Sequence, residues 1–148
     1  MKPEASHALE RLMQALLAEV APALQPAYRQ ASVAIQAMMV GAIREELDRA
    51  AARRVDENRA LRRLFAEAAP VVEDAALRER VGAAAASADA SLLVPELEAG
   101  NRALRSLLIE LHAHVETLAG DAARRVEAAI WHELAASTER RKLALGPC

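Results

Sequence analysis

An apolar seam between Leu97 and Leu118 constrains the fold of this chain more than any other feature. Its members recur at alternating steps of four and three residues, the spacing of a heptad seam. They are Leu97, Asn101, Leu104, Leu108, Leu111, Val115 and Leu118. This spacing places every member on one side of an α-helix. We therefore expect Leu104, Leu108 and Leu111 to lie in a seam between packed helices.

The phrase Asn-Arg-Ala-Leu-Arg occurs twice, beginning at Asn58 and at Asn101. With an offset of 43 residues, residues 58–73 and 101–116 are identical at nine of sixteen positions, which indicates a duplicated helical hairpin. Two interpretations of the asparagines remain open. Each is either a buried polar residue that fixes the register of the seam or an N-cap that begins a helix. The arginines that follow them lie off the seam, where we expect solvent.

The composition predicts an all-α fold. Hydrophobic residues make up 53% of the chain but aromatic residues only 2%, so Ala and Leu, both strong helix formers, carry the apolar share. Runs of β-branched and aromatic residues are absent. We expect an antiparallel helical bundle of about four main helices with one or two short ones. The 148 residues fit a single domain, 1–148, with a short tail at 144–148.

Apolar periodicity, Pro and Gly predict where the helices begin and end. The expected helices span about 5–20, 26–69, 71–86, 95–119 and 121–142. The second could be broken near Asp56, and residues 83–95 are expected to form a loop. Ser6 and Asp121 are candidate N-caps, and Gly120 is the expected end of the preceding helix.

The least polar run, residues 31–43, is too short for a membrane span, which needs about 18 residues. We expect it to be a helix buried on most sides in the bundle core, and we expect no membrane partner. The formal net charge is −2, and acids are interleaved with the arginines of residues 53–63. That pattern favours a solvated helix face over a nucleic-acid site. Lone Cys148 and the lack of a secretory signal favour the cytoplasm.

The segment Glu-Leu-His-Ala-His-Val-Glu, residues 110–116, is the strongest candidate for metal chemistry. Glu110 and His114 are one helical turn apart, as are His112 and Glu116. The two histidines are two residues apart and point to different faces, so the four side chains cannot converge on one ion. Surface His–Glu pairs are the favoured interpretation, and we expect no metal and no cofactor.

Residues Pro22–Asp48 resemble the beginning of a family of uncharacterised bacterial helical proteins. In that family a Pro-Leu motif leads into an apolar helix that closes with an Arg-Glu-Leu phrase, matched here by Arg44 to Leu47. Such proteins tend to be encoded beside aminoglycoside-phosphotransferase-like kinases and acyl-CoA dehydrogenases. The resemblance covers about a fifth of the chain. It implies an accessory role near acyl-CoA metabolism and no catalytic residues.

Three functional hypotheses follow from the sequence. The leading one is a non-catalytic helical interaction module, a homodimer that serves as an accessory to a protein partner, with Trp131 as an interface anchor. The first alternative is a protein that binds an acyl-type ligand in an apolar pocket around Met38, Met39 and Trp131. The second alternative is a metal-dependent enzyme that uses His and Glu residues on the helices.

Overall fold

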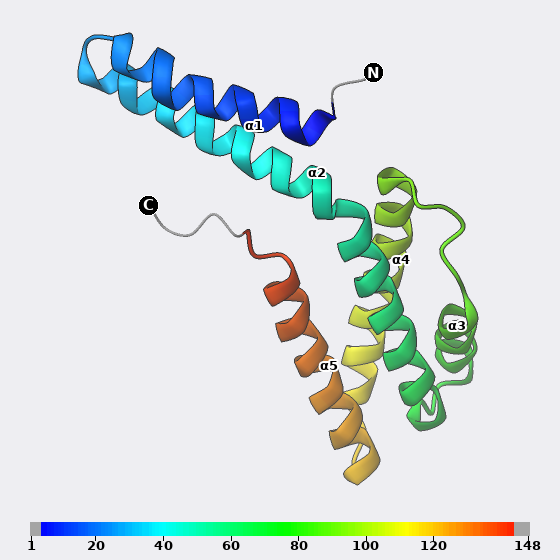
Figure 1. Cartoon of the computed structure of the whole chain (residues 1–148). Coiled ribbons are helices and arrows are strands. Elements are labelled where there is room, and N and C mark those ends of the chain that lie inside the picture. The colour runs from blue at the N-terminus through cyan, green and yellow to red at the C-terminus, as the bar shows by residue number, and fades with distance from the viewer. Residues whose placement is uncertain (1–3, 144–148) are drawn as a thin grey trace. The chain divides into compact units, whose positions relative to one another are not determined.

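The computed structural model describes residues 4–143, and the chain is all-α over that range, as the sequence predicts (Figure 1). The helices are α1 (Ala5–Ala15), α2 (Ala27–Ala68), α3 (Ala75–Ala86), α4 (Val94–Val115) and α5 (Asp121–Arg140). A π-helical turn, Leu16–Val20, continues α1, and a 3-10 turn, Ala69–Val71, follows α2. No β-strand occurs between residues 4 and 143. The expected tail, residues 144–148, lies outside the described residues.

Several helix boundaries differ from the prediction. The helix expected to reach residue 119 before Gly120 ends at Val115, and two predicted N-caps are wrong. Pro26 precedes α2, and α2 runs through Asp56 without a break. Gly120 is the N-cap of α5 at a φ of 102°, which makes Asp121 the first residue inside the helix. Ser6 also lies inside its helix, where its hydroxyl donates to Asp48 Oδ2 at 2.9 Å. None of the helices in the described part is long and apolar enough to cross a membrane.

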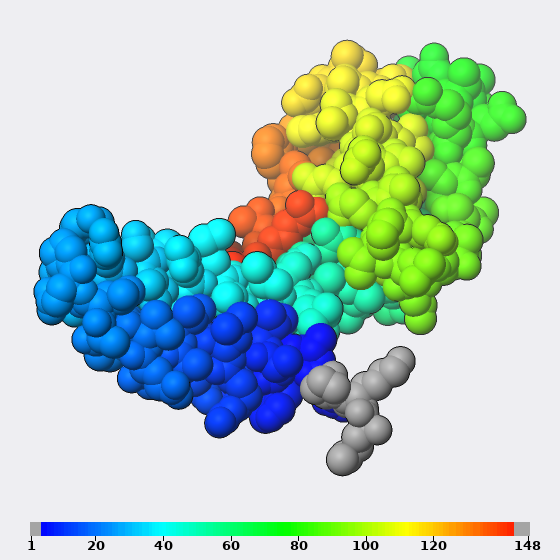
Figure 2. Space-filling model, turned by 90° about the horizontal axis from the view of Figure 1, so that it is seen from above, coloured from blue at the N-terminus to red at the C-terminus, as the bar shows by residue number. Residues whose placement is uncertain are grey.

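The chain divides into two compact units, where the sequence predicts one domain. The first comprises the described residues up to Ala50 together with Leu143, and the second is Ala51–Lys142. In the first unit, α1 and the beginning of α2 lie side by side as a helical hairpin, the blue and cyan helices of Figures 1 and 2. The hydrogen bond from Ser6 to Asp48 joins the open end of this hairpin.

The first unit has almost no core of its own. Its buried apolar side chains are Ala37 and Ala50. Residues 31–43, expected to be buried on most sides, instead leave Ile35, Met39 and Ile43 more than half exposed. That expectation is wrong because only one partner helix, α1, covers this part of α2. A two-helix hairpin can bury one face of each helix and no more.

The second unit contains the hydrophobic core. Its largest fully buried apolar side chains are Phe65 from α2, Leu97 and Leu111 from α4, and Ile130 from α5. The seam residues Leu104, Leu108 and Leu111 are all buried here, together with Val81 of α3. The seam therefore packs within the chain, against helices of the same unit.

The two copies of the repeat lie side by side in the second unit. Contacts with α4 join residues 54 and 98, 58 and 101, and 73 and 114, where residues 54 and 58 lie in α2 and Glu73 lies just after the 3-10 turn. The sequence separations of these pairs are 44, 43 and 41 residues, nearly constant, so α2 and α4 run in the same direction. The offset of the repeat is thus also the offset of the contacts. Pro70, which has no counterpart in the second copy, falls in the 3-10 turn after α2.

Candidate functional site

The two repeated asparagines meet in the interior. Asn58 and Asn101 are 0% and 1% exposed, and each lies inside a helix rather than at its start. Asn101 Nδ2 donates to Asn58 Oδ1 at 2.9 Å. Asn58 Nδ2 in turn donates to Asp89 Oδ1 at 2.9 Å. Of the two open interpretations, the structure therefore supports the buried residue that fixes register, because any slip of α4 along α2 breaks this amide pair.

Glu57, next to Asn58, is a buried carboxylate with four donors around it. Arg141 donates to both of its oxygens, at 2.8 and 2.7 Å. Asn101 and Ser137 each donate at 3.3 Å. Burial raises the pKa of Glu57, but the hydrogen bonds and charge of Arg141 outweigh burial and hold that pKa below its ordinary value. Protein donors occupy both oxygens of the carboxylate. The cluster therefore has a structural role, in which Glu57 of α2 holds Asn101 of α4 and Ser137 and Arg141 at the end of α5.

Arg62 and Arg105, which we expected to be solvated, instead form hydrogen bonds with other side chains of the second unit. Arg62 donates to Asp89 at 2.6 Å and to the Ser87 hydroxyl at 3.1 Å. Its hydrogen bond lowers the pKa of Asp89, against the opposing effect of burial. These contacts pin the loop between α3 and α4 to α2. Arg105 donates to the Ser137 hydroxyl at 3.3 Å. The expectation of solvated arginines is therefore wrong at Arg62 and Arg105.

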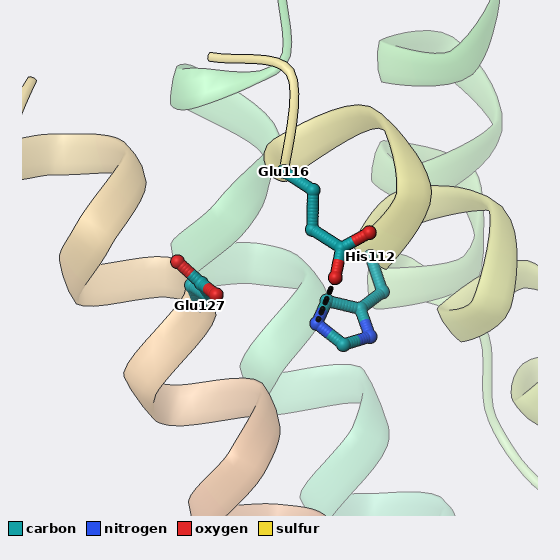
Figure 3. A group of neighbouring side chains, drawn as sticks. All are labelled: His112, Glu116 and Glu127. Atoms are coloured by element: carbon teal, nitrogen blue, oxygen red, sulfur yellow. Dashed lines mark ion pairs between the residues drawn. The ribbon is translucent and has the colours of Figure 1, made fainter. Parts of the chain in front are cut away.

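A mixed histidine and carboxylate cluster lies where α4 meets α5 (Figure 3). One ligand atom from each of His112, Glu116 and Glu127 lies within 4.8 Å of the other two. His112 and Glu116 come from adjacent turns at the end of α4, and Glu127 comes from α5. The His112 ring packs edge-on against Trp131, with ring centres 5.2 Å apart and planes at 86°. Sequence reasoning found the first pair but missed Glu127, which is distant in sequence and reaches the site only through tertiary packing.

The other half of the 110–116 motif is engaged elsewhere. His114 Nε2 accepts a hydrogen bond from the Glu73 amide at 3.1 Å. Glu110 forms an ion pair with Arg80 of α3. The structure thus separates His114 and Glu110 from His112, as their spacing on the helix predicts.

The residues proposed for an apolar pocket belong to different units. Met38 and Met39 lie in the first unit and are 41% and 60% exposed, while Trp131 lies in the second and is 56% exposed. The pocket that would join them stays a prediction. Within the second unit, one hollow with apolar lining holds about 250 Å³ between Leu64, Val71 and Val126. That volume is below the roughly 300–1,000 Å³ typical of small-molecule sites, whereas a hollow of about 500 Å³ in the same unit, with Arg59, Arg62 and Asp89 in its lining, falls within that range.

The chain has no significant match to a protein-family model, to a curated protein or to a solved structure. The family resemblance of residues 22–48 therefore stays a prediction, and function has to be argued from the geometry.

Proposed function

We propose that this chain is a helical interaction module that forms a homodimer through the exposed apolar side of its first unit. The proposal rests on a set of large apolar side chains on the hairpin of α1 and α2 that are at least 41% exposed. We call the α2 part of this set the outer face, and it consists of Tyr28, Ile35, Met38, Met39, Ile43 and Leu47.

The centre of the outer face lies opposite Ala37, the buried residue on the inner side of α2, and Met38 and Leu47 lie at its two edges. An α-helix turns by about 100° per residue. Ile35 and Met39 therefore each project about 160° away from Ala37, the buried residue on the inner side. Tyr28 and Ile43 fall between Ile35 and Met39 or close beside them. The first half of α2 is apolar on two opposite sides, a pattern typical of a helix inside a bundle rather than on its surface.

The outer face exposes enough area for one side of an interface at the small end of the standard range. Its six residues are between 41% and 66% exposed. Taking about 200 Å² per large side chain, they expose roughly 650 Å². A standard interface buries about 800 Å² per partner. Covering this area would complete the missing core of the first unit.

The charge pattern favours a second copy as the partner. Between Ala27 and Ile43 the only charged residue is Arg29. The stretch of the outer face from Tyr28 to Ile43 is therefore nearly free of charge, so it can form the two-fold contact in which the same patch serves on both subunits. Two hairpins paired in this way make a four-helix bundle, the smallest arrangement in which each helix buries an apolar stripe among neighbours. The family resemblance adds the proposal that such a dimer is accessory to another protein.

The proposal is tested by placing a charge on the outer face. We expect the unaltered chain to elute at the dimer mass in size-exclusion chromatography with light scattering. The variants Ile35→Glu and Met39→Glu should shift it to the chain mass, because a dimer interface would bury two unpaired carboxylates. The matched control is Ile109→Glu, a substitution at a 71% exposed residue of α4 in the second unit, which should leave the dimer intact.

Two results would contradict the proposal. One is an unaltered chain that runs at the chain mass at every micromolar concentration. The other is a dimer that survives both outer-face substitutions or is lost in the Ile109→Glu control. Helix content measured by circular dichroism separates loss of dimerisation from loss of folding.

A further inference from the structure

We propose that His112, Glu116 and Glu127 form a binding site for a divalent transition-metal ion, with Zn²⁺ as the best match. The site belongs to the second unit alone. It is therefore independent of the dimer proposed for the first unit. An experiment that rules out the dimer does not rule out the metal site, and the reverse also holds.

The connection between α4 and α5 brings the three ligands together. Only four residues, Thr117–Gly120, separate Glu116 from the start of α5. Gly120 makes the short turn possible, because its φ of 102° is one that residues with a side chain rarely adopt. The chain reverses there, so the last turn of α4 packs beside the first turns of α5. His112 and Glu116 then present one face of α4 to Glu127, as Figure 3 shows.

An unsatisfied nitrogen supplies the second, independent sign of a ligand. His112 Nε2 is shielded from solvent and has no hydrogen-bond partner among the described residues. Glu116 Oε1 lies 3.6 Å from this nitrogen, which is within ion-pair distance but beyond hydrogen-bond range (Figure 3). Buried polar atoms are almost always paired, and an exception of this kind points to a missing partner. Trp131 packs edge-on against the imidazole on another side of the ring.

The ligand set selects the class of metal. One imidazole nitrogen and two carboxylate oxygens are ligands of Zn²⁺, which binds both atom types at about 2.0–2.2 Å. Calcium and magnesium prefer oxygen-only sites with six or more ligands. The two carboxylates offset the charge of the ion. Glu116 is more than half exposed, so water can reach the fourth position of a tetrahedral site.

The geometry needs only small movements to close on an ion. Ligands of a tetrahedral zinc site lie about 3.4 Å apart, given bonds of about 2.1 Å. The three ligand atoms lie within 4.8 Å of one another before any ion is bound. The exposed Glu116 side chain has the freedom to supply the remaining movement. The ion would then link α4 to α5.

Zinc titration of the full chain, stripped of metal by a chelator, tests the site. We expect one Zn²⁺ per chain by calorimetry and a change in the fluorescence of Trp131, the only tryptophan. His112→Ala and Glu127→Gln should each weaken binding by more than the roughly 10–100-fold that loss of an outer-shell partner costs. The matched controls are His132→Ala, an exposed histidine beside Trp131, and Glu110→Gln, a carboxylate on the same helix. Both controls should bind as the unaltered chain does.

The proposal is overturned if Zn²⁺ does not bind, or if binding survives both ligand substitutions. It is also overturned if His132→Ala removes as much affinity as His112→Ala, because that result marks adventitious surface binding. Glu127→Gln keeps the size of the side chain, so it remains informative even if His112→Ala disturbs the packing against Trp131.

Discussion

Replacing Arg141 by Gln tests how much the buried carboxylate of Glu57 contributes to the stability of the second unit. Arg141 donates both hydrogen bonds of a bidentate pair to Glu57, whose side chain is 2% exposed. Without Arg141, the carboxylate keeps Asn101 and Ser137 as donors and Arg140 as a nearby positive charge, but loses its bidentate ion-pair partner. The substitution should therefore destabilise the fold and alter how its stability depends on pH.

The expected loss of stability is about 2 kcal/mol. Removing one partner of a fully buried ion pair costs about 3–5 kcal/mol. Arg141 is 47% exposed, so solvent already screens part of its attraction, and the two remaining donors offset more. For a chain of this size, 2 kcal/mol corresponds to a Tm about 4–8 °C lower.

The pH dependence has a definite sign. In the unaltered chain the pKa of Glu57 is lowered, so its contribution to stability is present above the unfolded pKa of 4.5 and lost as pH falls through the lower folded value. Arg141→Gln removes the two largest effects that lower the pKa of Glu57, so its folded pKa should rise relative to the unaltered chain. The native state of the variant then takes up a proton at a higher pH than the native state of the unaltered chain does. The difference in stability between the two proteins should shrink as pH falls from 7 toward 4.

Urea unfolding at a series of pH values measures this difference. Arg124→Gln is the matched control, because Arg124 pairs with Asp121 in an ion pair whose two side chains are 70% and 79% exposed. Exposed pairs contribute about 0–1 kcal/mol. A loss for Arg141→Gln that equals the control, or that stays constant between pH 7 and pH 4, would refute the reasoning about Glu57.

Three further substitutions test the local account of the fold, each by thermal or urea unfolding. Asp74→Ala removes the side chain that accepts from the Leu77 amide at the start of α3, and should cost about 1 kcal/mol. Gly120→Ala forces a side chain onto a φ of 102° and should cost about 1–3 kcal/mol. Phe65→Ala empties a fully buried site and should cost about 3–5 kcal/mol, while Ile109→Ala, at an exposed site, should cost little.

Periodicity predicts the helices of this chain well because their determinants are local. The steps of four and three from Leu97 to Leu118 define the buried face of α4, and Pro and Gly residues set the helix boundaries. The continuity of α2 through Asp56 also follows from local sequence, since no Pro or Gly lies between Gly41 and Pro70. The N-cap of α5 was misplaced by one residue because Gly120 itself takes the capping position.

Which helix or side chain covers a given face of a helix depends on tertiary packing, and the periodicity of the sequence does not predict it. The run 31–43 has the composition of a core helix, yet only α1 covers it within the chain. His112 and Glu116 could be paired from their spacing, but Glu127 joins them only through the packing of α5 on α4. Glu57 is a further example. Its charged sequence surroundings predict a surface residue, but in the structure it is buried and paired with Arg141, which is 84 residues away in the sequence.

Sedimentation equilibrium of the unaltered full chain, from submicromolar to high micromolar concentration, tests the central claim most directly. The uncovered outer face of α2 predicts a single species of twice the chain mass that dissociates only at the lowest concentrations. A mass equal to one chain throughout that range would contradict the claim, because the roughly 650 Å² of apolar surface on the outer face would then remain without a partner copy.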